Sequence, residues 1–145
     1  MREIVTEISI NAAPETVWSH LVAFDSYPDW NPFITYAAGE VREGARLTVT
    51  IQQSGGKPMG FKPRVLIASP GKELRWLGQI LLPGLFDGEH RFVLEHHEGG
   101  TKLTQAETFC GLLVPLMWKS MQPKTKRGFE MMNEALRQRC ESGDS

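Results

Sequence analysis

A histidine and a glutamate in the last third of the chain have the residue types and the spacing to move a proton. The run Glu98-Gly99-Gly100-Thr101 predicts a hairpin closed by a two-residue Gly-Gly turn, with Glu98 paired to Thr101. In that register His90 and Glu107 are diagonal neighbours, roughly 7 Å apart at the backbone and closer at the side-chain tips. An imidazole that shares a proton with a carboxylate can take a proton from a carbonyl compound and return it, which is the chemistry of a cyclase or dehydratase.

The face of the hairpin that carries this pair, together with Gln105, is otherwise apolar. The other face carries charged and hydroxyl side chains, so the apolar face is predicted to point inward. A carboxylate buried without a partner is costly, and three interpretations of His90 and Glu107 stay open. They form a structural hydrogen-bonded pair, they recognise a ligand, or they catalyse a reaction. The apolar members of the face are Phe92, Leu94, Leu103 and Phe109.

The rest of the chain predicts the strands and short helices that would position this face. Pro14 opens a short amphipathic helix, and residues 25–32 predict a second, broken helix before the chain returns to a strand. Pro63 has no backbone N–H and therefore predicts an edge or a bulge. Alternation of apolar and polar residues predicts further strands at 4–10, 46–52, 61–67, 74–80, 90–97 and 101–109.

A long helix is predicted from Pro115 to about Glu141. A helix of about 27 residues is roughly 40 Å long, enough to cross a whole curved sheet. The face of this helix opposite its apolar residues carries lysines and arginines, which predicts a solvated surface. The apolar residues that recur at helical spacing are Met117, Met121, Gly128, Phe129, Met132, Leu136 and Cys140.

Composition and charge predict an ordinary single domain at 1–141 with a disordered tail at 142–145. The chain has 145 residues, of which 41% are hydrophobic and 23% are charged. Its 16 basic and 17 acidic side chains provide no field toward nucleic acid, so no nucleic-acid partner is expected. No apolar run reaches the roughly 18 residues of a membrane span, which predicts no integral membrane contact. Two isolated cysteines, read as reduced thiols, favour a cytoplasmic location. A weak homodimer stays open.

The histidines do not have the spacing of metal ligands. His96 and His97 are neighbours on a strand and point to opposite faces, and His20 has no second ligand at i+4. No Gly-x-Ser-x-Gly motif occurs, and the glycine pairs 55–56 and 99–100 close hairpins instead of opening helices. We therefore predict no metal and no cofactor.

Four stretches of the chain resemble a known family. The first begins at Ala13, continues through Val17-Trp18, and ends in Tyr27-Pro28-Asp29-Trp30-Asn31-Pro32. The others are 83–92, 105–113 and 128–136. Together they resemble the polyketide cyclase/dehydrase branch of the START-like (SRPBCC) superfamily over nearly the whole chain. The resemblance implies an α+β helix-grip fold: a curved antiparallel seven-stranded sheet, two short helices after the first strand, and a long C-terminal helix packed across the sheet over a cavity.

A cavity of this kind implies a function, because its default role is to hold a small, mostly apolar molecule. The leading hypothesis is binding or carriage of a lipid-, polyketide- or terpenoid-like ligand without catalysis. The alternative is a cofactor-independent cyclase or dehydratase that uses His90 and Glu107 as an acid–base pair. A third hypothesis is a protein-interaction module, as in the co-chaperone-like members of the superfamily.

The predicted ligand site combines polar anchors, an apolar wall and a rim. Gln105 joins the histidine–glutamate pair as a polar anchor. Trp30 and Asn31 either cap one end of the sheet or border the pocket mouth, and Phe86 either forms the opposite lip or tucks down. The apolar wall is predicted from Trp76, Ile80, Phe92, Leu94, Phe109, Met121 and Phe129.

Overall fold

The computed structural model describes residues 1–53 and 55–142. Of the predicted tail, 142–145, only Ser142 lies within the described residues. Strands and short helices fill the chain up to Cys110, and one long helix completes it. In chain order the elements are β1 (Arg2–Ile10), α1 (Pro14–Leu21), the 3-10 helix η1 (Phe24–Ser26), α2 (Tyr27–Trp30), β2 (Ile34–Ala38), β3 (Thr48–Ile51), β4 (Met59–Phe61), β5 (Arg64–Ser69), β6 (Glu73–Ile80), β7 (Phe86–His97), β8 (Gly100–Cys110) and α3 (Val114–Glu141).

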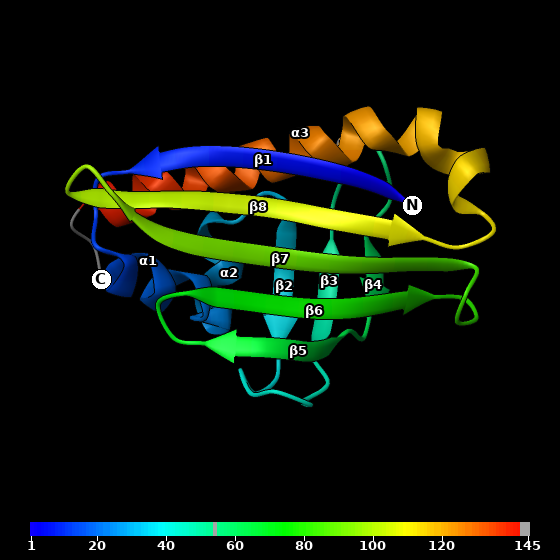
Figure 1. Ribbon diagram of the computed structural model, residues 1–145, viewed down its shortest axis with the longest axis horizontal. Helices are drawn as coiled ribbons and strands as arrows, with labels where there is room; N and C mark the ends of the chain where they lie inside the picture. The colour runs from blue at the N-terminus through cyan, green and yellow to red at the C-terminus, as the bar shows by residue number, and fades with distance from the viewer. Residues whose placement is uncertain (54, 143–145) are drawn as a thin grey trace.

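The strands form two antiparallel sheets. The larger sheet has five strands in the order β1-β8-β7-β6-β5, and the smaller has three in the order β2-β3-β4. In Figure 1 the five-stranded sheet faces the viewer, with α3 running along β1 and with α1, α2 and the smaller sheet behind it. A long C-terminal helix laid across an antiparallel sheet is the predicted α+β helix-grip arrangement.

The described residues contain eight strands in two sheets, so the prediction of seven strands in a single sheet is wrong. The predicted strand 61–67 is divided at Pro63, which separates β4 from β5. Pro63 cannot donate a ladder hydrogen bond, but its carbonyl accepts one from the Leu47 N–H at 2.8 Å. The chain therefore leaves its pairing with β3 at this point and begins a new pairing with β6.

The last hairpin turns one residue earlier than predicted. Its strands pair His97 with Gly100, which leaves Glu98 and Gly99 as the turn, both with positive φ angles of 48° and 83°. Gly100 is drawn into β8 because β1 passes close by, and a Cβ there would lie 2.4 Å from the Ile10 carbonyl oxygen. His90 consequently lies directly opposite Glu107. The predicted diagonal register is wrong, but the shift of two residues keeps the same side chains facing inward.

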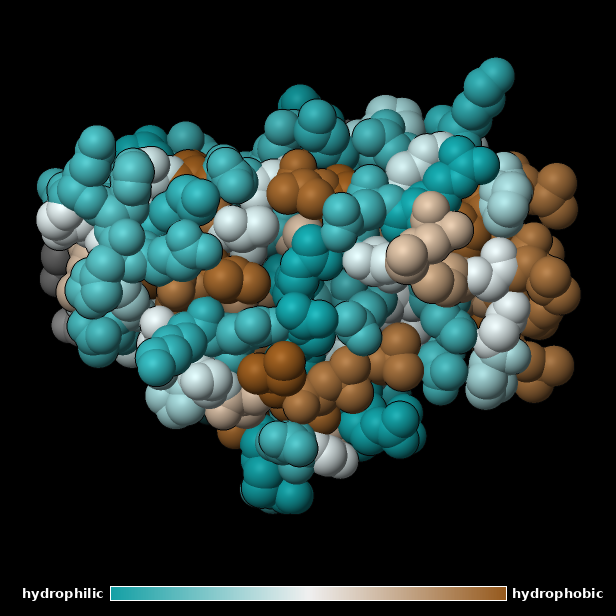
Figure 2. Space-filling view, viewed as in Figure 1, coloured by the Kyte–Doolittle hydropathy of each residue, from teal (hydrophilic) through white to brown (hydrophobic). Residues whose placement is uncertain are grey.

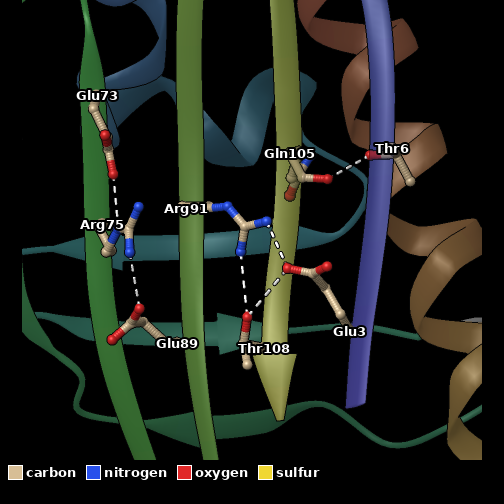
Figure 3. A network of polar contacts seen from close by, with 8 residues as sticks. All are labelled: Glu3, Thr6, Glu73, Arg75, Glu89, Arg91, Gln105 and Thr108. Carbon is tan, nitrogen blue, oxygen red and sulfur yellow. Dashed lines mark hydrogen bonds and ion pairs between the residues drawn. The ribbon is translucent and has the colours of Figure 1, made fainter. Parts of the chain in front are cut away.

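The outer face of the larger sheet carries ion pairs within and between its strands (Figure 3). Arg75 on β6 contacts Glu73 at 2.7 Å and Glu89 at 3.0 Å. Arg91 on β7 contacts Glu3 of β1 at 2.7 Å. These charged ladders leave the apolar side chains on the opposite face, toward α3 and the smaller sheet.

His20 on α1 is buried near α3 and gives the fold a pH dependence that can be measured. Burial, and then the Arg139 guanidinium, lower the pKa of His20 below its ordinary value of about 6.5. The unfolded chain then binds more protons than the folded chain, so the stabilisation is complete above about pH 6.5 and is lost as the pH falls through the lowered pKa. We expect His20→Gln to flatten this decline in urea denaturation between about pH 7 and 5. The control His97→Gln, on the exposed end of the hairpin, should leave the decline unchanged. An unchanged decline in His20→Gln would contradict the assignment of this pH dependence to His20.

Candidate ligand-binding site

A cavity of about 260 Å³ lies between one end of the larger sheet, the smaller sheet and the first half of α3. This volume is just below the roughly 300–1,000 Å³ that is usual for small-molecule sites. The smaller sheet and its flanking residues contribute Phe33, Ile34, Ile51, Gln53, Met59 and Phe61. The helix side contributes Leu113, Met117, Met121 and Thr125.

Cross-strand rows of β6, β7 and β8 form the floor of the cavity. The first row pairs Ile80 with Phe86, the second contains two paired glycines, and the third contains the polar residues. The glycine row has no side chains on β6 and β7, which leaves room above the sheet. The second row is Gly78, Gly88 and Phe109, and the third is Trp76, His90 and Glu107.

Gly88 gives the Glu107 carboxylate its place on this floor. A Cβ at Gly88 would lie 2.0 Å from Glu107 Oε2, closer than any real side chain allows. Glu107 lines the cavity and its side chain is 18% exposed. The glycine therefore lets the carboxylate lie flat over the backbone of β7, beside His90.

His90 is enclosed by aromatic rings and holds hydrogen bonds at both ring nitrogens. Its ring stacks on Trp76, with centroids 5.3 Å apart, and lies 4.7 Å from Phe92. Nδ1 lies 2.9 Å from Glu107 Oε1, and Nε2 lies 3.0 Å from Gln105 Oε1. His90 is only 4% exposed, so these two bonds supply the polar partners that a buried imidazole requires.

The hydrogen bonds continue from Gln105 through α3 to β1. Gln105 Nε2 donates to Asn133 Oδ1 at 2.7 Å and to the Phe129 carbonyl at 3.3 Å. Asn133 Nδ2 donates to Thr6 Oγ1 at 2.9 Å. The Thr6 hydroxyl donates in turn to the Gln105 carbonyl at 2.7 Å (Figure 3). This chain joins β7, β8, α3 and β1 in a buried network with its partners satisfied, and such networks favour one arrangement of the core.

The cavity opens at an apolar end of the molecule. Met59, Leu81 and Met117 line it and are also 40%, 70% and 44% exposed. The loops on either side of β7 and β8 are tied together there, because the Leu113 N–H donates to the Leu85 carbonyl at 3.0 Å. Figure 2 shows hydrophobic side chains gathered at the end where β8 runs into α3. The exposed leucines at this end are Leu81, Leu82 and Leu112 of these loops and Leu116 in the first turn of α3.

Seven of the residues predicted for the site line the cavity, and six lie elsewhere. Phe92 and Phe129 have no exposed surface, because the second half of α3 packs directly on the sheet and leaves no space there. Gln105 is also fully buried and reaches the cavity only through His90. The residues in the lining are Trp76, Ile80, Phe86, His90, Glu107, Phe109 and Met121. The residues outside it are Trp30, Asn31, Phe92, Leu94, Gln105 and Phe129.

Asn31 caps the start of β2, and neither Asn31 nor Trp30 lines the cavity. Asn31 Oδ1 accepts hydrogen bonds from the N–H groups of Phe33 at 3.0 Å and Ile34 at 2.8 Å. The Trp30 ring packs edge-on against Tyr27, with centroids 5.3 Å apart. The two residues act on the cavity indirectly, because this turn places Phe33 and Ile34 in its wall.

Several residues of the site were missed from the sequence. The two glycines of the floor carried a usable signal, since glycine inside a strand often marks a close approach. Asn133 carried another, because it follows Phe129 by one turn on the buried face of α3. Phe33 and Phe61 gave no signal beyond being apolar, and Thr6 resembles any strand threonine.

Other reactive groups lie outside the cavity. Cys110 is an exposed free thiol, and Cys140 is buried, which raises the pKa of its thiol to about 11. Within residues 1–53 and 55–142, no three His, Cys, Asp or Glu side chains gather closely enough to hold a metal ion. In the same part of the chain, no helix has both the length and the apolar character to cross a membrane.

The long helix held across a curved antiparallel sheet, with a cavity between them, defines a helix-grip protein of the START-like (SRPBCC) superfamily. Within it, the chain belongs to the family described as polyketide cyclase / dehydrase and lipid transport, which matches residues 1–141. The comparison with curated proteins gave no match.

Solved structures share the fold over nearly the whole chain. Protein MLL2253 from Mesorhizobium loti is 21% identical with a TM-score of 0.77, over 99% of this chain and 100% of that one. TTHA0849 from Thermus thermophilus is 18% identical with a TM-score of 0.78, over 99% and 100%. The ZhuI aromatase/cyclase from a Streptomyces species is 13% identical with a TM-score of 0.78, over 97% and 93%. At these identities the likeness establishes the fold.

Proposed function

We propose that the protein binds a small, mostly apolar ligand in this cavity and holds the ligand's polar group against Glu107. One observation carries the proposal: an apolar cavity with a single carboxylate on its floor, its Oε2 lying over Gly88. Apolar surface that enters such a cavity gains roughly 25 cal/mol per Å² removed from water, and the carboxylate orients the ligand. The family description supports a lipid- or polyketide-like ligand.

The open end supports carriage as well as binding. Leu81, Met59 and Met117 belong both to the lining and to the exposed surface, so a ligand can pass between them without meeting a charged side chain of the lining. Methionine and leucine side chains adapt to ligands of different shape. A carrier needs such an entrance, because it must release its ligand as well as hold it.

A second candidate function, cyclase or dehydratase, is favoured by the contact between Glu107 and His90. Oε2 can accept a proton from a C–H or O–H group of the ligand while the proton held between Oε1 and Nδ1 moves fully onto His90. The products of this step are a ligand anion, a protonated carboxyl and an imidazolium, so the charges balance. The ZhuI aromatase/cyclase shares the fold, which is compatible with this candidate.

Calorimetric titration with naphthalene-sized probes tests the cavity. We expect binding with a negative heat-capacity change, the marker of apolar burial. Gly78→Val points a side chain into the floor beside Phe61, where even a Cβ would lie 3.1 Å from the ring, and should weaken binding at least about tenfold. The control Gly60→Ala, with its nearest neighbour 3.8 Å away, should bind like the natural protein.

Two results would contradict the proposal: no binding of any apolar probe, or equal binding by the natural protein and Gly78→Val. Turnover separates the two candidate functions. Loss of water from a β-hydroxyketone probe that stops in Glu107→Gln would support the enzyme, because an amide cannot accept the proton. Binding without turnover would support the carrier.

A further inference from the structure

The buried hydrogen-bond network has only one consistent direction. The Thr6 hydroxyl has one hydrogen, and it donates that hydrogen to the Gln105 carbonyl, which can only accept. Thr6 Oγ1 must therefore accept from Asn133 Nδ2, 2.9 Å away. This leaves Asn133 Oδ1 as the acceptor that faces Gln105.

The direction of the network extends to His90. Gln105 places Nε2 near two acceptors, Asn133 Oδ1 and the Phe129 carbonyl, so its Oε1 must be the atom that faces the imidazole. An amide oxygen can only accept, and His90 Nε2 consequently carries a hydrogen. Two backbone carbonyls on different elements thus determine which ring nitrogen is protonated.

The protonation of the histidine–glutamate pair depends on the same network. His90 Nδ1 and Glu107 Oε1 lie 2.9 Å apart, and they must share one proton because two lone pairs would otherwise face each other. The pair is then either imidazolium and carboxylate or imidazole and carboxylic acid. Both forms have no net charge, and in both forms Glu107 Oε2 carries no proton.

Oε2 is the free hydrogen-bonding position of this pair. It has no hydrogen-bond partner among residues 1–53 and 55–142, it lies over Gly88, and Glu107 lines the cavity. The nitrogen of Gln53, another polar side chain of the lining, is already bound to Thr125 Oγ1 at 2.8 Å. A ligand in the cavity therefore meets an acceptor oxygen on the floor.

We propose that the cavity selects an uncharged ligand that carries a hydroxyl or N–H donor for Glu107 Oε2, and that Thr6 and Asn133 are positioning residues that hold the hydrogen on His90 Nε2 and so keep the histidine–glutamate pair without net charge. This inference rests on the proposed function, because it needs a ligand in the cavity. A carbonyl or ether oxygen would face Oε2 acceptor to acceptor. A carboxylate would lose its hydration without gaining a donor.

Four probes of one ring system test the selection: 2-naphthol, 2-methoxynaphthalene, naphthalene and 2-naphthoate. We expect 2-naphthol to bind at least about tenfold more tightly than 2-methoxynaphthalene, as a hydrogen bond to a charged group allows. Naphthalene should bind about as well as the methyl ether, and 2-naphthoate more weakly than either.

Three variants test which side chain causes the preference for 2-naphthol over its methyl ether. Glu107→Leu should abolish it, because the acceptor is gone. Glu107→Gln should retain most of it, since the amide N–H can donate to His90 Nδ1 and leave the amide oxygen over Gly88. Gln53→Leu is the control for the other side of the cavity and should keep the full preference.

The positioning role has its own readout, the ¹⁵N spectrum of the imidazole. We expect Nε2 of His90 to be protonated at neutral pH in the natural protein. In Asn133→Leu, Gln105 Nε2 keeps only the longer hydrogen bond to the Phe129 carbonyl at 3.3 Å, so the orientation of Gln105 is less fixed and the His90 Nε2 signal should move toward that of an unprotonated nitrogen. The 2-naphthol preference and naphthalene binding should both persist, because Oε2 stays an unprotonated acceptor when the histidine hydrogen lies on Nδ1.

The outcomes separate this inference from the proposed function. Equal affinity for 2-naphthol and its methyl ether, or an unprotonated Nε2 in the natural protein, would overturn the inference while naphthalene binding still supports the cavity. A preference that disappears in Gln53→Leu instead of Glu107→Leu would also overturn it. Failure of every probe to bind would overturn both.

Discussion

Gly88→Ala is expected to remove the Glu107 carboxylate from His90 and so to dismantle the polar floor of the cavity. The new Cβ would lie 2.0 Å from Oε2, and the flexible carboxylate is the group that must move. His90 Nδ1 then loses its partner in an aromatic enclosure. An unsatisfied buried group of this kind costs about 1–3 kcal/mol in free energy of unfolding, measured by urea denaturation.

The variant Gly88→Ala/Glu107→Ala tests this explanation. If the collision with the carboxylate causes the loss, Gly88→Ala should cost much less when it is added to Glu107→Ala than when it is added to the natural protein. Gly60→Ala on β4 is the matched control, because its Cβ has ordinary space, and it should be neutral within about 0.5 kcal/mol. An equal cost of Gly88→Ala in the presence and in the absence of Glu107 would show that the strand itself, and not Glu107, requires the glycine.

His90→Leu is expected to cost about 3 kcal/mol in free energy of unfolding, because it breaks one side of a buried polar pair. Gln105 Oε1 loses its donor at a position with no exposed surface, and Glu107 loses the group that shares its proton. The apolar contacts of the ring with Trp76 and Phe92 are largely replaced by the leucine side chain. The loss therefore reports on hydrogen bonds more than on packing.

A double-mutant cycle with Glu107→Met measures the coupling of the pair. The double variant should be less destabilised than the sum of the single variants, since replacing both partners leaves fewer unsatisfied groups. His96→Leu, on the exposed end of β7, is the control and should change the stability by less than about 0.5 kcal/mol. Additive losses would place the cost in packing and contradict the proposed pairing.

The inward face of the last hairpin could be read from the sequence because alternation is a property of the backbone itself. A strand points successive side chains to opposite faces, so the apolar set of β7 and β8 had to share one side and to bring His90, Gln105 and Glu107 with it. The register could not be read in the same way. Gly99 and Gly100 both suit a turn, and the choice between them is made by the close approach of β1 at Ile10.

The family resemblance of the opening stretch correctly indicated the fold, while the role of its Asn31 became clear only in three dimensions. Its side chain caps the N–H groups of Phe33 and Ile34, and so it shapes the cavity wall without touching the cavity. The break at Pro63 was also visible, because a residue without an N–H interrupts a ladder wherever it lies. That the break creates a separate small sheet depended on the pairing of β4 with β3.

The sequence by itself determined the class of fold, the long helix and the set of polar side chains that face the interior, because each follows from periodicity or from a local turn. Only the tertiary structure decided which part of the inward face is a cavity. The second half of α3 packs on the sheet and buries Phe92 and Phe129, while the first half leaves space over Gly78 and Gly88. The tertiary structure also assigned the proton on His90, through contacts from β1 and α3. Contacts between residues a hundred positions apart carry no local pattern, and only the folded chain brings them together.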